Sequence, residues 1–90
     1  MANITSDFQQ TDGWYQTTVE VSGDFLMHVE TDKPTDLQVW QKCDPDAPSP
    51  DLTDTFKGVT CKEVQYTTDF ASAVTIKSSE PVTYASIIEA

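Results

Sequence analysis

Cys43 and Cys61 are the residues of this chain with the widest chemistry, because a thiol can bond to a second thiol or to a metal. One ends a strand-like run and the other lies within the next, so antiparallel pairing of those runs would bring the two together. A disulfide there would stabilise the fold by about 3 kcal/mol in the chain-entropy view. Cytoplasmic synthesis favours two packed free thiols, whereas a virion or cell-surface destination permits oxidation. The sequence leaves both states open.

His28 is the only histidine, and it lies in the middle of a strand-like run. General acid–base catalysis needs a hydrogen-bonded partner and a cleft, and nothing in the sequence marks Asp24 or Glu30 as that partner. A zinc site needs more ligands than one histidine and two cysteines without a CxxC pair. The chain also lacks a nucleophile elbow and a glycine-rich phosphate loop. We therefore expect no catalytic residue, no metal, no cofactor and no enzymatic activity.

The segment from Asp44 to Asp54 contains four aspartates and three prolines, and it is the one long loop that the pattern predicts. Carboxylate oxygens are the hard ligands that Ca²⁺ prefers. The spacing departs from an EF-hand, because Pro48 stands at the fifth position and Ser49 where glycine is needed. The pattern favours a solvated acidic loop and leaves calcium binding at an irregular site open.

Four apolar residues are candidates for contacts with a partner protein. Trp14 and Trp40 fall on the otherwise polar faces of their strand-like runs, and Ile4 and Phe8 are the large apolar side chains of an otherwise polar start. Aromatic residues build cores as well as interface hot spots. We expect most aromatics of this chain in the core and these four residues at a partner surface.

Period-two alternation of apolar and polar residues predicts the elements that position these side chains. Turn-forming Gly, Pro, Asp and Ser separate the runs, and the first two runs make a plausible hairpin. The fold class is therefore all-β, a small antiparallel β-sandwich or barrel of about six to seven strands. Residues 1–13 are predicted to be an extended N-terminal arm, with a short helix capped near Thr5 or Ser6 as the alternative. Residues 14–90 are predicted to be a single β-sandwich domain. The strand-like runs are 14–21, 25–31, 37–43, 56–68, 70–77 and 82–88.

Charge narrows the range of partners. The 90 residues contain ten Asp and five Glu against five Lys and no Arg, a net charge of −10. Binding of nucleic acid or of an anionic membrane depends on Lys and Arg, so neither partner is expected. A domain of this size has a thin core and often gains stability from oligomerisation. Residues 1–13 lack a signal-peptide pattern, so we expect synthesis in a cytoplasm.

The order of strands and turns resembles the short β-sandwich accessory proteins of tailed-bacteriophage virions, which are head decoration (cement), head-fibre and tail-associated proteins. The resemblance implies a protein that sits on a capsid lattice, often as a trimer, and reinforces the shell. Its partners would be the major capsid protein or neighbouring copies of itself, and its location the virion. Ala85 stands where many such modules have a basic residue, and the acidic loop and the cysteines lie outside the pattern. The resembling segments are 21–25, 37–42, 66–68, 74–77 and 82–87.

The sequence thus leaves three candidate functions for this chain. The first is a structural virion component of the capsid decoration, cement or fibre type, made in the host cytoplasm. The second is a surface or secreted module that binds a glycan or a protein through Trp14 and Trp40. The third is an acidic mimic of nucleic acid that inhibits a host protein, which the net charge of −10 motivates.

Overall fold

The computed structural model describes residues 2–68 and 70–89, and over these residues the fold is all-β, as predicted. Every strand pair in the described chain is antiparallel. The one helical element is a short 3₁₀ turn, and no helix of the described chain is long and apolar enough to span a membrane. The elements are β1 (Ala2–Asn3), η1 (Thr5–Asp7), β2 (Gln9–Thr11), β3 (Trp14–Val21), β4 (Phe25–Lys42), β5 (Leu52–Tyr66), β6 (Ser72–Ser78) and β7 (Val82–Glu89).

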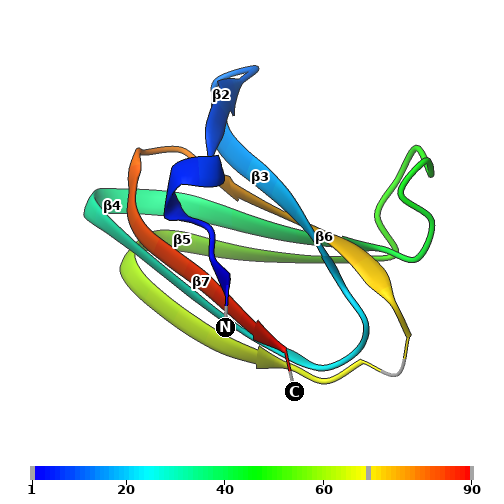
Figure 1. Cartoon of the computed structure of the whole chain (residues 1–90). Coiled ribbons are helices and arrows are strands. Elements are labelled where there is room, and N and C mark those ends of the chain that lie inside the picture. The colour runs from blue at the N-terminus through cyan, green and yellow to red at the C-terminus, as the bar shows by residue number, and fades with distance from the viewer. Residues whose placement is uncertain (1, 69, 90) are drawn as a thin grey trace.

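Strand β4 organises the sheet. Its first half, residues 25–31, lies between β7 and β5, and its second half, residues 37–42, lies between β6 and β5. Strand β3 joins the outer side of β6, with β2 beyond it, and β1 joins β7. The sheet therefore folds over along the β4–β5 hairpin into two layers. The first layer contains β1, β7 and the first half of β4, and the second contains the second half of β4, β6, β3 and β2. Figure 1 shows the β4–β5 hairpin running to one end of the molecule and turning back.

The core fills the space between the layers with alternate residues of β4, β6 and β7. Phe25 stacks on Tyr66 with 5.0 Å between ring centroids, which joins the first layer to the end of β5. Burial of such side chains stabilises the fold by about 1.5–3 kcal/mol each. The largest fully buried apolar side chains are Phe25, Met27, Val29, Leu37, Val39, Val74, Ile76 and Ile87.

The predicted turn at residues 32–36 is instead a bend within β4. Pro34 is exposed where the register between β4 and β5 shifts, so its missing N–H removes no ladder hydrogen bond. Gly58, with φ +66°, lies opposite in β5 where the register shifts, as at a β-bulge. Thr35 is buried beneath the bend and shares a 2.7 Å hydrogen bond with the Ser78 hydroxyl. Two predicted strands are therefore one.

The hairpin predicted from the first two runs does not form. Strand β3 pairs with β6 and β2, whereas β4 pairs with β5, β6 and β7. The chain passes through residues 22–24 from one layer to the other, so β3 and the first half of β4 face each other across the core. Alternation places apolar faces inward in both arrangements, and for this reason it does not distinguish them.

The predicted free N-terminal arm is not confirmed, because residues 2–11 pack on their own domain. Ile4 is a core residue with 3% of its surface exposed, and its N–H donates to the Ala85 carbonyl at 3.0 Å. The Ala85 N–H donates in turn to the Thr5 hydroxyl at 2.9 Å. Asp12 and Gly13 both have positive φ, as in the tight turns that join hairpin strands, and they connect β2 to β3. The segment thus bridges β7 and β3 and closes one side of the sandwich.

Candidate functional site

The outer face of the first layer brings polar side chains together from three strands. On β4, His28 and Glu30 are two residues apart and point to the same side of the sheet. The register places Glu63 of β5 beside His28, and it places Cys61 of β5 and Tyr84 of β7 on either side of Glu30. Because directly paired residues share a face, these five side chains form one surface cluster.

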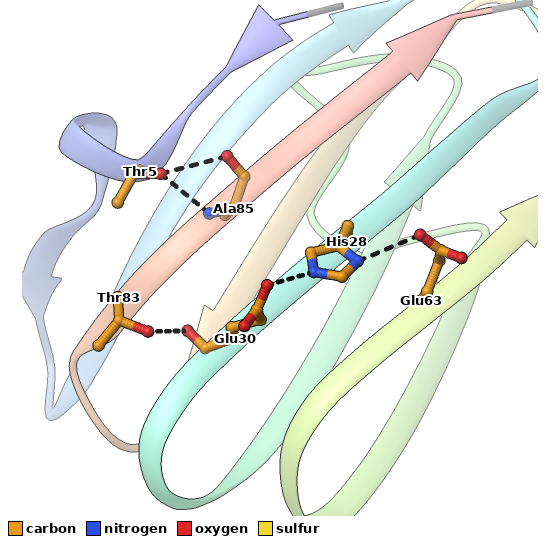
Figure 2. Close-up of polar contacts among 6 residues, drawn as sticks. All are labelled: Thr5, His28, Glu30, Glu63, Thr83 and Ala85. Atoms are coloured by element: carbon orange, nitrogen blue, oxygen red, sulfur yellow. Dashed lines mark hydrogen bonds and ion pairs between the residues drawn. The ribbon is translucent and has the colours of Figure 1, made fainter.

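His28 hydrogen-bonds to a carboxylate through each ring nitrogen. Its Nε2 lies 2.7 Å from Glu30 Oε2 and its Nδ1 lies 3.1 Å from Glu63 Oε1, and Figure 2 shows the ring between the two carboxylates. The ring also packs edge-on against Tyr84, with centroids 5.6 Å apart. The hydrogen bond to Glu30 raises the pKa of His28 above its ordinary value, partial desolvation opposes the rise, and Glu63 adds to it. An imidazolium can donate to both carboxylates at once.

Cys61 completes a set of three different ligand types. Its Sγ and one ligand atom each of His28 and Glu30 all lie within 4.8 Å of one another. Among the described residues, this is the group in which three potential metal ligands lie so close to one another. The set was not expected, because the sequence prediction considered each of these residues without its cross-strand partner.

The Cys43–Cys61 disulfide that the sequence left open is not present, and the two thiols are free but not packed. Both cysteines are free and exposed. Cys61 pairs with Glu30 in the first half of β4, whereas Cys43 lies just past the far end of that strand. Desolvation, and after it the carboxylate of Asp51, raises the pKa of the Cys43 thiol. The two thiols therefore lie in different places because β4 continues through its bend.

Two carboxylates of the acidic loop accept hydrogen bonds from the backbone of the loop and of the residue before it. Asp44 Oδ1 accepts the Asp46 N–H at 3.0 Å, and Asp51 Oδ2 accepts the Cys43 N–H at 2.7 Å. Asp54 is not in the loop at all but in β5. These contacts support the acidic-loop interpretation, while calcium binding by the loop remains an open prediction.

Trp40 and Trp14 share the outer face of the second layer, as their alternation predicted. Trp40 is half-buried in a hollow of about 450 Å³ whose other lining is mainly Thr, Gln and Lys. The Lys77 ammonium stands 3.7 Å above the centre of the Trp40 ring, and the indole N–H donates to the Gln38 side chain at 3.2 Å. Trp14 is half-buried at the start of β3.

Ile4 and Phe8, the other two predicted contact residues, pack within the domain itself. Ile4 lies in the core, and Phe8 is half-buried against it. Their apolar character, which suggested a partner surface, is explained by closure of the domain itself. The prediction for Ile4 is therefore wrong, because a side chain with 3% exposure offers no contact surface.

The third distinctive surface is the outer edge of β5. This strand of fifteen residues pairs with β4 alone, and no described strand covers its other edge. Leu52 is 50% exposed, and Phe56 and Val64 are half-buried at the margin of the core. The Lys62 ammonium lies 4.7 Å from the centre of the Phe56 ring, so the two halves of β5 face each other across an open side of the sandwich.

Comparisons of this chain with models of protein families, with curated proteins and with solved structures found no match.

Proposed function

We propose that this chain is a structural, non-enzymatic protein that assembles with copies of itself through the free edge of β5. We place it, by its sequence resemblance, among the capsid decoration, cement or fibre-type components of a virion. The observation that carries the proposal is the fifteen-residue strand with one unpaired edge. A row of free backbone N–H and C=O groups is a template for a strand from another subunit.

Side chains beside this edge add an apolar contribution. One is half-exposed and three are partly buried at the open side of the core, where an added strand would cover them. Each square ångström of apolar surface that is removed from water contributes about 25 cal/mol. The closure that residues 2–11 give to one side would thus come from a neighbouring subunit on the other. The side chains are Leu52, Phe56, Val59 and Val64.

Local charge favours a second copy as the occupant. Residues 52–66 contain two lysines, one aspartate and one glutamate, and are neutral as a segment, whereas the whole chain carries −10. Two β5 edges can therefore meet without like charges facing each other as strongly as the net charge of the chain would suggest. The bulge at Gly58 divides the edge into two straight stretches, one in each layer. Pairing of one stretch with the other stretch of the next copy is head-to-tail, and such contacts close into rings such as the trimer that the resemblance implies.

The positions of the polar groups support a binding role over catalysis. His28 is absent from the lining of the hollow beside Trp40 and from that of a second hollow beside Cys43, and both of its ring nitrogens hydrogen-bond to carboxylates. The glycan-binding alternative needs a free aromatic face, and Lys77 occupies that of Trp40. The nucleic-acid-mimic alternative needs carboxylates in a phosphate-like array, whereas Asp44 and Asp51 bind their own loop.

Light scattering on a size-exclusion column tests the proposal. The wild-type chain should elute as a closed oligomer, with a trimer as the specific expectation. The double variant L52K/Q65K places one lysine at an exposed position in each stretch of β5 and should elute as a monomer. Its free energy of unfolding should change by about 0.5 kcal/mol or less, because both sites are on the surface.

The matched control is S6K/Q10K, which adds the same charge at exposed positions on the opposite side of the domain. This control should remain oligomeric. A wild-type chain that stays monomeric over the accessible concentration range, or an L52K/Q65K variant that assembles like wild type, would overturn assembly through β5. Stoichiometric co-purification with assembled particles tests the virion placement separately, and its failure for an oligomeric chain would reject that placement alone.

A further inference from the structure

The surface cluster on β4 and β5 contains three different types of metal-ligating group. His28 offers an imidazole nitrogen, Glu30 a carboxylate and Cys61 a thiol, with the three ligand atoms within 4.8 Å of one another. Ligands at about 2.0–2.3 Å from a tetrahedral ion lie roughly 3.3–3.8 Å apart, so small side-chain rotations bring the three to binding distance. We propose that these three residues bind one divalent transition-metal ion, for which Zn²⁺ is the best match.

The donor set selects the class of ion. Thiolate and imidazole are the ligands that Zn²⁺ and its neighbours in the first transition row prefer, whereas Ca²⁺ and Mg²⁺ prefer sites made of oxygen alone. Three protein ligands leave the fourth tetrahedral position to water, because the side of the site that faces away from the sheet is open. His28 has 23% and Glu30 47% of its side chain exposed, so an ion can reach the site from solvent.

Glu63 supplies what a metal-binding histidine needs at its second nitrogen. A ligand imidazole usually donates its other N–H to a carboxylate, which fixes the tautomer and orients the ring. Glu63 Oε1 lies 3.1 Å from Nδ1 of His28, on the side of the ring away from Glu30 (Figure 2). The Nε2 atom, now 2.7 Å from Glu30, would exchange its proton for the ion, with Glu30 as its neighbour in the coordination sphere.

The strands hold the ligands in place before any ion binds. The first half of β4 is paired on both sides, with β5 and with β7, so His28 and Glu30 come from a backbone that has no free edge. The Thr83 hydroxyl donates to the Glu30 carbonyl at 3.0 Å, and the Tyr84 ring packs against His28. Little of the binding energy is therefore lost in ordering the site. The site lies on the outer face of the sheet, so the inference is independent of assembly through the β5 edge.

Titration of the reduced, metal-free chain with Zn²⁺ by calorimetry, and with Co²⁺ by absorption spectroscopy, tests the site. We expect one ion per chain and, with Co²⁺, the charge-transfer absorption of a thiolate–cobalt bond. C61S should lose this absorption and should weaken Zn²⁺ binding at least about tenfold, because the soft ligand is gone. E63Q should keep the absorption and weaken binding by about 10–100-fold, as loss of a carboxylate behind a ligand histidine does elsewhere.

The matched control is C43S, because Cys43 is the other exposed thiol of the chain. It should bind Zn²⁺ and Co²⁺ as wild type does. Thermal melting of each apo variant shows that the fold is intact, which is expected since Cys61 and Glu63 are exposed. Binding that survives C61S, binding that is lost equally in C43S, or wild-type binding too weak to measure at 100-fold excess metal would each overturn the site.

Discussion

The two sides of this sandwich, where the layers meet water, are closed by different means. On one side residues 2–11 cross from β7 to β3 and bury Ile4, which is 3% exposed. On the other side β5 has no further neighbour among the described strands, and Lys62 over Phe56 is what spans the gap. The chain thus completes one side of its core from its own residues and leaves the other partly open. The difference indicates where stability resides and where association is to be sought.

The N-terminal side is held by packing and by directional hydrogen bonds together. The Ala85 carbonyl accepts the Ile4 N–H there, and the Ala85 N–H donates to the Thr5 hydroxyl. Figure 2 shows the Thr5 side chain beside the backbone of Ala85. The β5 side has a cation above a ring and a half-exposed leucine instead. Three substitutions measure this difference, from the largest effect to the smallest.

Ile4→Ala should cause the largest loss of stability. Truncation of a fully buried isoleucine leaves a cavity and costs about 2–5 kcal/mol. The matched change on the other side, Val64→Ala, should cost about 1 kcal/mol or less, because that side chain is only partly buried. Urea unfolding followed by far-UV circular dichroism measures both. Equal losses would mean that the two sides contribute alike, and the comparison would fail.

Thr5→Val should have an intermediate effect. The substitution keeps the shape of the side chain and removes the oxygen that accepts the Ala85 N–H at 2.9 Å. An unsatisfied, partly buried donor costs about 1–3 kcal/mol. Thr83→Val is the control, since its hydroxyl lies at an exposed position where water can replace it, and it should cost about 0.5 kcal/mol or less. Similar melting temperatures for the two variants would show that the N-terminal hydrogen bonds contribute little.

Gly58→Ala should have the smallest effect of the three. An added methyl group would meet no atom within 4 Å, so the loss comes from backbone strain at φ +66° alone. That strain is about 1 kcal/mol for an L-residue in the left-handed region. Gly58→Asn should lose less, because asparagine tolerates this region. If alanine leaves the stability unchanged, the bulge has another conformation available and does not fix the bend of β5.

Alternation predicted most of the strands and the faces of their side chains, because burial on one side of a sheet repeats every second residue. It also separated Trp14 and Trp40 from the core. It did not show that β4 continues past Pro34, since a proline at a register shift and a proline in a turn have the same local sequence. Ile4 was placed outside the domain because its neighbours are polar, although a single apolar side chain is enough to fill the gap it occupies.

The cluster around His28 could not be predicted from the sequence, and the reason is a different one. The spacing of His28 and Glu30 on one strand face was visible, and it is the one local signal of the site. The positions of Cys61 and Glu63 depend on the register between β4 and β5, which a bulge shifts at the bend. A one-residue error in that register turns every side chain to the opposite face. Long-range pairing therefore decides the chemistry of this surface.

The position of β7 has a consequence for how the chain folds. This strand, the last along the described chain, lies between β1 and the first half of β4, so the opening residues find their partner only when the closing ones are present. Pairings between distant segments must precede most of the gain from burial, which makes folding slow compared with that of helical domains of equal size. Until β7 arrives, β4 has a bare edge, and this interval is when a growing chain is most exposed to aggregation.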